Sequence, residues 1–280
     1  MNNKKILVLG GKGKTGRKVA QKLADQNYYV RIGSRSGNPS FDWEDPTTWN
    51  AVLEGIDAVY ITFQPDLAVP GAVETITTFT NKVVESGVKK LVLLSGRGEK
   101  EAEECEKIVM KARANWTIVR ADWFHQNFSE SFLLEPIQMG HVVLPRNETS
   151  VAFVDTDDIA DVVVASLLDD VHNGKIYELT GPELITFQDA VSEIAKFTDK
   201  DIKFTGVTID EYAKMLKGYG IPESYVWLVT YLFEEVLDGR NETLTNDVEK
   251  VLGRKAKSFS DYVKETAESG IWKENIAQIL

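Results

Sequence analysis

Four glycines lie between an apolar segment and an amphipathic segment near the start of the chain. The letters GGKGKTG at residues 10–16 fit both G-x-G-x-x-G and G-x-x-G-x-x-G. Glycines at these positions permit a tight turn, let a phosphate approach the backbone and let a helix pack closely on its strand. The N-terminus of that helix offers N–H groups and partial positive charge to a pyrophosphate. The motif therefore predicts a dinucleotide site, formed by Gly10, Gly11, Gly13, Lys14, Thr15 and Gly16.

A P-loop is the obvious competitor, because Gly13-Lys14-Thr15 matches the end of its motif. The P-loop motif G-x-x-x-x-G-K-[ST] requires its first glycine where this chain has Val8. The spacing excludes that alternative.

The end of the second predicted strand indicates which dinucleotide is bound. An NAD site usually has an acid there that binds the ribose 2′-hydroxyl. This chain has Arg35 between Ser34 and Ser36, and no acid between Asp25 and Asp42. A guanidinium pairs with a 2′-phosphate, which a carboxylate would repel. We therefore expect NADP(H) in preference to NAD(H), with Ser34 and Arg35 among the cofactor-binding residues.

Short apolar segments alternate with helical patterns through the first half of the chain. Strands are expected at residues 5–9, 28–34, 58–63, 90–95 and 117–120, and helices near residues 15–26, 46–53, 72–86, 100–114 and 123–135. Such alternation indicates a parallel sheet with right-handed crossovers. The expected fold class is α/β, a Rossmann doubly wound parallel sheet with a smaller, mostly helical C-terminal substrate lobe.

We expect residues 1–135, with residues 151–180 returning to the sheet, to form the dinucleotide-binding lobe. Residues 136–150 and 181–280 would form the substrate lobe, with amphipathic helices near residues 186–197, 209–217 and 223–236.

The composition of the chain limits the classes of partner that it could bind. The chain has 280 residues and a formal net charge of −11, with a pI of about 4.9. An acidic surface argues against nucleic acid or an anionic membrane as a partner, and the partner we expect is a small-molecule substrate. One cysteine, Cys105, cannot form an internal disulfide, so a reducing cytoplasm is expected. The scattered histidines and the lone cysteine form no metal-ligand pattern.

Seven segments carry a family resemblance. They are GGKGKTG, FDWEDPTTW, LVLLSG, WTIVRADWFHQNF, VDTDDIADV, YELTGPELITFQDA and GRKAKSFSDYVKETAESGIW, and they occur in that order. The set resembles the NmrA-like branch of atypical short-chain dehydrogenases/reductases, and looks closest to the subgroup of festuclavine and agroclavine dehydrogenases and their bacterial relatives. The resemblance implies a Rossmann lobe and a smaller substrate lobe with a cleft between them.

The resemblance also assigns residues by position. Asp42 and Trp43 would lie beside the adenine, and Phe63, Gln64 and Pro65 would face the ribose and pyrophosphate. Ser95 occupies the place of a catalytic hydroxyl. The substrate would be bound by Trp123, Phe124, Asn127 and Phe128.

Some of these residues also have simpler structural interpretations. Ser95 could serve only to satisfy backbone groups at a strand end. His125 could donate a proton or be a structural histidine. The aromatic side chains could belong to the core.

One chemical feature departs from the family pattern. A standard short-chain dehydrogenase uses a Tyr-x-x-x-Lys dyad as its proton source, but no tyrosine lies between Gly96 and Asn115. Gly98 and Ala102 fall at the dyad positions. The expected function is NADPH-dependent reduction of a small apolar iminium compound, quinone or activated alkene. The alternative is a non-catalytic NAD(P)-sensing regulator.

Overall fold

The computed structural model describes residues 4–146 and 148–273, and the chain divides into two compact units. The first unit contains residues up to Ala121 together with Thr156–Leu179 and Asn246–Arg254. The second contains Asp122–Asp155, Thr180–Thr245 and the residues from Lys255 onward. Each unit has its own hydrophobic core. The chain enters the second unit at Asp122, earlier than the boundary expected near residue 135.

A parallel sheet forms the centre of the first unit, in the order β2-β1-β3-β4-β5-β8. Every pairing within it is parallel. The strands are β1 (Lys5–Leu9), β2 (Tyr29–Gly33), β3 (Ala58–Ile61), β4 (Lys90–Gly96), β5 (Asn115–Ala121) and β8 (Lys175–Leu179). The α/β, doubly wound prediction is confirmed.

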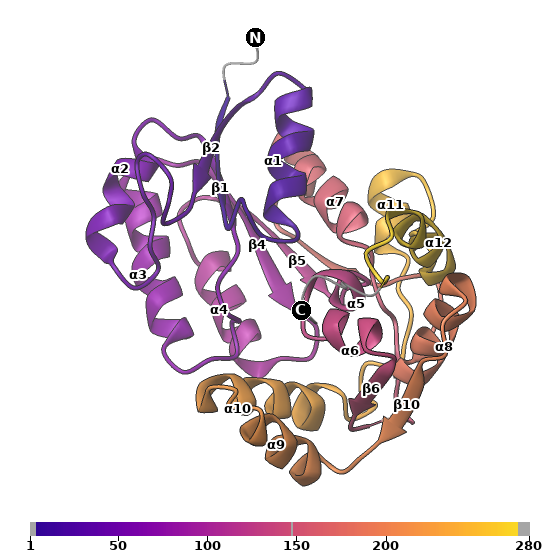
Figure 1. The fold of residues 1–280 in the computed structure, drawn as a ribbon. Helices are drawn as coiled ribbons and strands as arrows, with labels where there is room; N and C mark the ends of the chain where they lie inside the picture. Colours follow the sequence, from indigo (N-terminus) through magenta and orange to yellow (C-terminus); the bar gives the residue numbers. More distant parts are fainter. Residues whose placement is uncertain (1–3, 147, 274–280) are drawn as a thin grey trace. The chain divides into compact units, whose positions relative to one another are not determined.

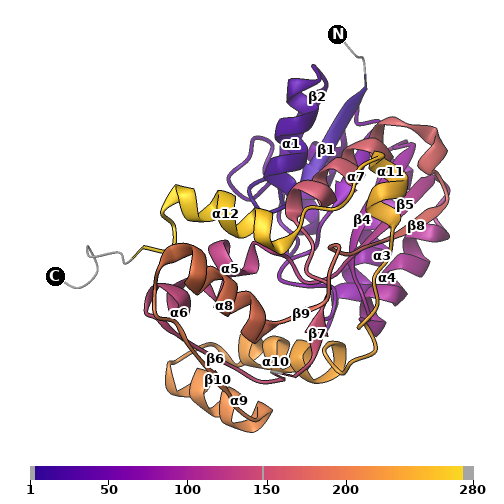
Figure 2. The same ribbon diagram turned by 90° about the vertical axis from the view of Figure 1, so that its right-hand side faces the viewer.

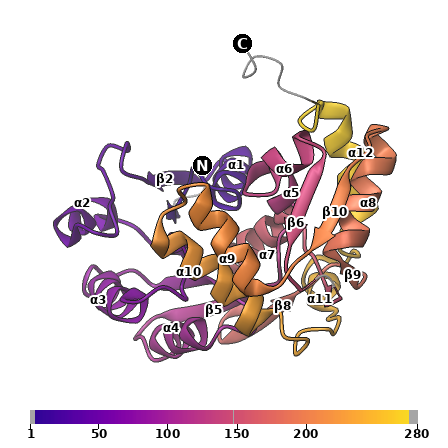
Figure 3. The same cartoon turned by 60° about the horizontal axis from the view of Figure 1, so that its bottom comes forward.

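Helices cover both faces of this sheet (Figures 1 and 3). One face carries α1 (Gly16–Asp25), α7 (Thr156–Leu168) and α11 (Asp247–Leu252). The other carries α2 (Trp49–Leu53), α3 (Ala72–Glu85) and α4 (Lys100–Met110). Helix α1 buries Val19 and Leu23, because apolar residues at this spacing share one face.

The second unit is mostly helical with two small sheets. Figure 2 shows β6 (His141–Leu144) beside β10 (Lys203–Gly206), a parallel pair. The short strands β7 (Ser150–Val151) and β9 (Ile185–Thr186) pair antiparallel. The helices are α5 (Asn127–Glu130), α6 (Leu134–Gln138), α8 (Phe187–Thr198), α9 (Ile209–Gly218), α10 (Glu223–Tyr231) and α12 (Phe259–Ser269). No helix in the described part of the chain is long and apolar enough to cross a membrane.

The prediction of a single helix over residues 123–135 is wrong, because the structure has two short helices there, α5 and α6. The Trp123 carbonyl accepts from the Val154 N–H at 2.9 Å, and the His125 N–H donates to the Val154 carbonyl at 3.0 Å. These bonds pair Phe124 with Val154 as in a strand, and the Trp123 carbonyl is no longer available to a helix. Ser131, with φ −147° and ψ −160°, then separates α5 from α6. The helix expected over 223–236 also changes character, since Leu232–Val236 is a π-helix that continues α10.

A buried ion pair ties α4 to the sheet. Glu106 is fully buried, and Arg120 on β5 donates to both of its carboxylate oxygens, from Nε at 2.8 Å and from Nη2 at 2.6 Å. Arg120 also donates from Nη1 to Glu178 on β8 at 2.9 Å. The pair therefore joins three adjacent elements of the first unit.

Removing the cation of this pair should destabilise the protein strongly. Arg120→Met leaves the Glu106 carboxylate buried without its charged partner, and we expect a loss of about 3–5 kcal/mol. Arg113→Met removes an exposed arginine and should cost no more than about 0.5 kcal/mol. Urea unfolding measures both. Equal, small losses in the two variants would show that the Glu106 pair contributes little.

Candidate functional site

The glycine loop joins β1 to α1 with little room for side chains. Gly10 has φ +59°, and a Cβ there would overlap the Thr62 hydroxyl. A Cβ on Gly16 would overlap the Gly10 carbonyl oxygen and lie 2.7 Å from its carbon. The Gly13 N–H donates to the same Gly10 oxygen at 2.7 Å. Gly10 and Gly16 are thus required by the turn and by helix–strand packing, as the motif predicts.

Gly13 faces a different environment from its neighbours. A Cβ there would lie 3.2 Å from the Gly10 oxygen and 3.7 Å from Gln64 Nε2, so the backbone leaves more space on this side. Gln64 belongs to the segment Phe63–Pro65 that follows β3. The structure thus brings the middle of the glycine loop next to the segment expected at the ribose and pyrophosphate.

The N-terminus of α1 suits an anion. Its first turn contains no acidic residue, and Thr15 makes no side-chain cap. Thr15 is buried, and its hydroxyl accepts from the Tyr60 hydroxyl at 3.0 Å. In this geometry the Thr15 side chain links the glycine loop to Tyr60 on β3. Its contact with a cofactor stays a prediction. Lys14, beside it, is half-buried.

Two cationic side chains, those of Lys12 and Arg35, lie near the end of β2. Arg35 is exposed, and Lys12 donates from Nζ to the Ser36 hydroxyl at 2.6 Å. The sequence analysis did not select Lys12, although its position inside the glycine loop, one residue before Gly13, was a signal. The neighbouring Ser34 hydroxyl is buried without a hydrogen-bond partner among the described residues.

Aromatic side chains gather where β3 ends. Trp43 donates from Nε1 to the Thr62 carbonyl at 3.2 Å, and its ring centroid lies 5.0 Å from that of Phe63. The Asp42 carbonyl accepts from Trp49 Nε1 at 2.7 Å. Trp43 and Phe63 are both half-buried, so they leave an apolar surface of the kind that an adenine ring can contact.

The Ser95 hydroxyl is directed into the protein. Ser95 is buried and donates to Glu106 Oε1 at 2.7 Å, the carboxylate that Arg120 also binds. This arrangement favours the structural interpretation of Ser95, although the partner is a side chain rather than the backbone. A catalytic role stays a prediction.

His125 and Phe128 lie in the core of the second unit, and both are fully buried. His125 Nε2 lies 3.0 Å from the Phe153 carbonyl, so this nitrogen carries the proton, while Nδ1 lies 3.4 Å from Asp155 Oδ2. The imidazole contacts the rings of Phe259 and Tyr262. This geometry gives no support to a catalytic histidine. Trp123, Phe124 and Asn127 are half-buried.

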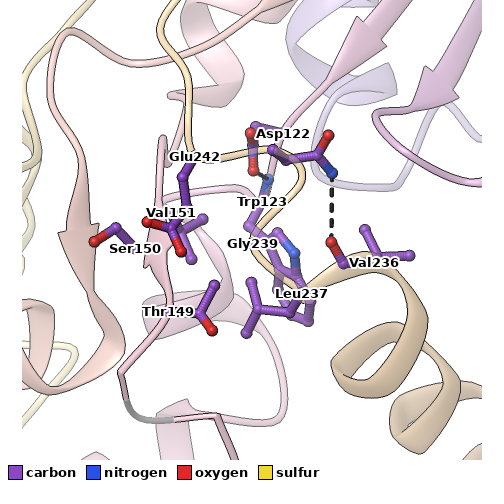
Figure 4. A pocket seen from close by; sticks show the side chains of 10 residues that line it. Asp122, Trp123, Thr149, Ser150, Val151, Val236, Leu237, Gly239 and Glu242 are labelled. Atoms are coloured by element: carbon purple, nitrogen blue, oxygen red, sulfur yellow. Dashed lines mark hydrogen bonds between the residues drawn. The ribbon is translucent and has the colours of Figure 1, made fainter.

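A hollow lies beside Trp123 within the second unit (Figure 4). It is lined by Asp122, Trp123, Thr149, Ser150, Val151, Val236, Leu237, Gly239, Asn241 and Glu242. Asn241 donates from Nδ2 to the Val236 carbonyl, at the end of the π-helix, at 3.4 Å. Of the four residues expected at the substrate, only Trp123 lines this hollow. No group of metal-ligating side chains occurs in the described residues.

The chain belongs to the NmrA-like family, whose model matches residues 2–268. It is 31% identical to prestalk A differentiation protein A of Dictyostelium discoideum, over 93% of this chain and 92% of that one. It is 26% identical to agroclavine dehydrogenase of Claviceps fusiformis, over 95% and 98% of the two chains. An NADPH-dependent quinone oxidoreductase of Escherichia coli, solved with NADPH, has a similar fold, with TM-score 0.79 at 17% identity over 94% and 99% of the chains.

The loop geometry predicts that two matched substitutions affect different properties: Gly16→Ala should lower stability, and Gly13→Ala should lower cofactor affinity. Gly16→Ala forces a methyl group against backbone that cannot move aside, and should destabilise the protein by about 1–3 kcal/mol. Gly13→Ala should change stability by about 0.5 kcal/mol or less, yet raise the Kd for NADP⁺ by about tenfold or more, equivalent to roughly 1.4 kcal/mol.

Chemical denaturation and calorimetry measure these two effects. Unchanged NADP⁺ affinity in a folded Gly13→Ala protein would contradict the placement of the phosphates.

Proposed function

We propose that the protein is an NADP(H)-dependent oxidoreductase that reduces a small, largely apolar molecule. The observation that carries the proposal is the strand–glycine loop–helix unit, with Lys12 and Arg35 beside it at the end of β2. A helix N-terminus binds a pyrophosphate, and two cations without a competing carboxylate suit a 2′-phosphate.

The relatives support the class of reaction. Agroclavine dehydrogenase and the quinone oxidoreductase are named for redox reactions, and the latter for its use of NADPH. An NAD(P)H azoreductase of Xenophilus azovorans is 24% identical over 92% of this chain and 96% of that one. Because the acceptors in these names differ, they support nicotinamide-dependent reduction rather than one substrate.

The bound cofactor would supply a hydride. The chain would hold the pyrophosphate at residues 10–16, the adenine against Trp43 and Phe63, and the 2′-phosphate at Lys12 and Arg35. Gly98 and Ala102 provide no acid at the dyad positions. We therefore expect acceptors that are already activated toward hydride, such as iminium ions, quinones or activated alkenes.

A non-catalytic dinucleotide-sensing regulator is the second candidate. It is favoured because neither expected catalytic side chain is placed to transfer a proton. The Ser95 hydroxyl donates to Glu106, and the His125 ring is fully buried. Such a protein would bind NADP(H) without turning over an acceptor.

Oxidation of NADPH with a panel of acceptors distinguishes the two candidates. We expect turnover with at least one quinone, iminium compound or activated alkene, and none with a plain ketone, because hydride transfer to a ketone needs an acid. Ordinary enzymes turn over at about 1–10³ s⁻¹, and a ketone reduced at such rates would contradict the proposed chemistry. Tight NADPH binding without turnover across the panel would establish the regulator instead.

Cofactor preference is tested at Arg35. Arg35→Ala should weaken NADP⁺ binding by about 1.5–3 kcal/mol, the range for hydrogen bonds to charged groups, and leave NAD⁺ binding almost unchanged. Lys12→Ala should act in the same direction. Arg113→Ala, which removes an exposed arginine elsewhere, is the control for net charge. Equal wild-type affinities for NADP⁺ and NAD⁺ in calorimetry would overturn the preference.

A further inference from the structure

Two carboxyl groups meet beside the segment expected to contact the cofactor. Asp66 directly follows Phe63–Pro65, and Glu99 lies in the connection between β4 and α4. Glu99 is only 7% exposed, and its carboxyl group lies within hydrogen-bonding range of the Asp66 carboxyl group. An ionised carboxylate can only accept a hydrogen bond. Two carboxyls can therefore bond to each other only when one of them carries a proton.

Packing fixes the position of this pair. A Cβ on Gly96 would overlap the Glu99 carboxyl group, so that carboxyl lies directly on the backbone at the end of β4. Glu99 precedes α4, but its side chain does not cap the helix; it interacts with Asp66 instead. Asp66 Oδ1 accepts from the Ala68 N–H at 2.8 Å, which fixes the other partner.

The surroundings of Glu99 and Asp66 favour the protonated form of the pair. Burial raises the pKa of Glu99 well above its usual value, and the adjacent Asp66 carboxyl raises it further. Burial also raises the pKa of Asp66. The charges of Glu101 and Glu106 also disfavour the ionisation of Glu99 and raise its pKa. The Glu106 charge is itself met by Arg120.

We propose that Glu99 and Asp66 are positioning residues that share one proton and hold the Phe63–Pro65 segment against the glycine loop. The proposal rests on the proposed function, because this segment acts through its contact with NADP(H). Gln64 lies beside the position that a Gly13 Cβ would occupy. Loss of the shared proton places two negative charges side by side in a buried site, so the segment is repelled from this position and cofactor affinity falls.

Calorimetric titration with NADP⁺ between about pH 6 and about pH 9 tests this, a range above the ordinary pKa of a glutamic acid. In Glu99→Gln the amide still donates to Asp66 but cannot titrate. We expect the wild-type Kd to rise about tenfold for each pH unit above the pKa of the pair, while Glu99→Gln lacks this rise. Glu104→Gln, an exposed change on the same helix, should follow the wild type. The ratio of Kd values at each pH cancels the titration of NADP⁺ itself.

Stability provides a readout that does not need the cofactor. A carboxyl whose pKa is raised by folding stabilises the protein fully below its unfolded pKa, and this contribution is lost as pH rises through the folded value. Wild-type stability in urea should therefore fall relative to Glu99→Gln as pH rises. Should Glu99→Gln not fold, Gly96→Ala is the second variant: its methyl group displaces the Glu99 carboxyl from its packed position, so NADP⁺ binding should be weak at every pH.

Parallel wild-type and Glu99→Gln profiles of both Kd and stability would overturn the shared proton. A pH-dependent difference in stability without one in Kd would overturn the positioning role alone. Failure of the wild type to bind NADP⁺ at any pH would overturn the proposed function, and the stability profiles would still decide whether the proton is shared.

Discussion

The packing of α1 onto the end of β1 is the constraint on which the candidate site depends. Gly16 approaches the Gly10 carbonyl so closely that no other residue fits without a backbone shift. This contact places the first turn of α1 directly at the end of β1, a strand whose last four residues are buried. The amide groups of that turn and the loop before it are consequently fixed before any ligand arrives, so a pyrophosphate would bind to a preformed surface.

The other residues predicted to bind the cofactor lie at the same edge of the sheet. Strands β2, β1, β3 and β4 are adjacent and parallel, so the segments that follow them emerge together: Ser34–Ser36, the glycine loop, Phe63–Pro65 and the connection containing Glu99. Ligands bind at this edge in doubly wound folds. The arrangement would place the proposed cofactor site within the first unit, and the sequence between Gly96 and Asn115 contains no tyrosine that could act as the standard proton donor.

Local patterns predicted most of the first unit. The strand expected at residues 5–9 matches β1, and the helix expected near residues 72–86 matches α3, because apolar runs and glycine boundaries depend on neighbouring residues. Features set by tertiary contacts were not predictable. The prediction of a helix over 123–135 was wrong because Val154 forms hydrogen bonds with Trp123 and His125. The position of Ser95 at a strand end did not indicate that its hydroxyl donates to Glu106. The contact of Lys12 with Ser36 and the Asp66–Glu99 pair become visible only when separate loops are brought together.

A crystal structure of the protein with NADP⁺ tests the central claim most directly. The account predicts that the pyrophosphate lies within hydrogen-bond distance of backbone N–H groups in residues 11–17, with the 2′-phosphate contacted by Lys12 or Arg35. A dinucleotide bound elsewhere, or a glycine loop that stays empty at saturating NADP⁺, would contradict it.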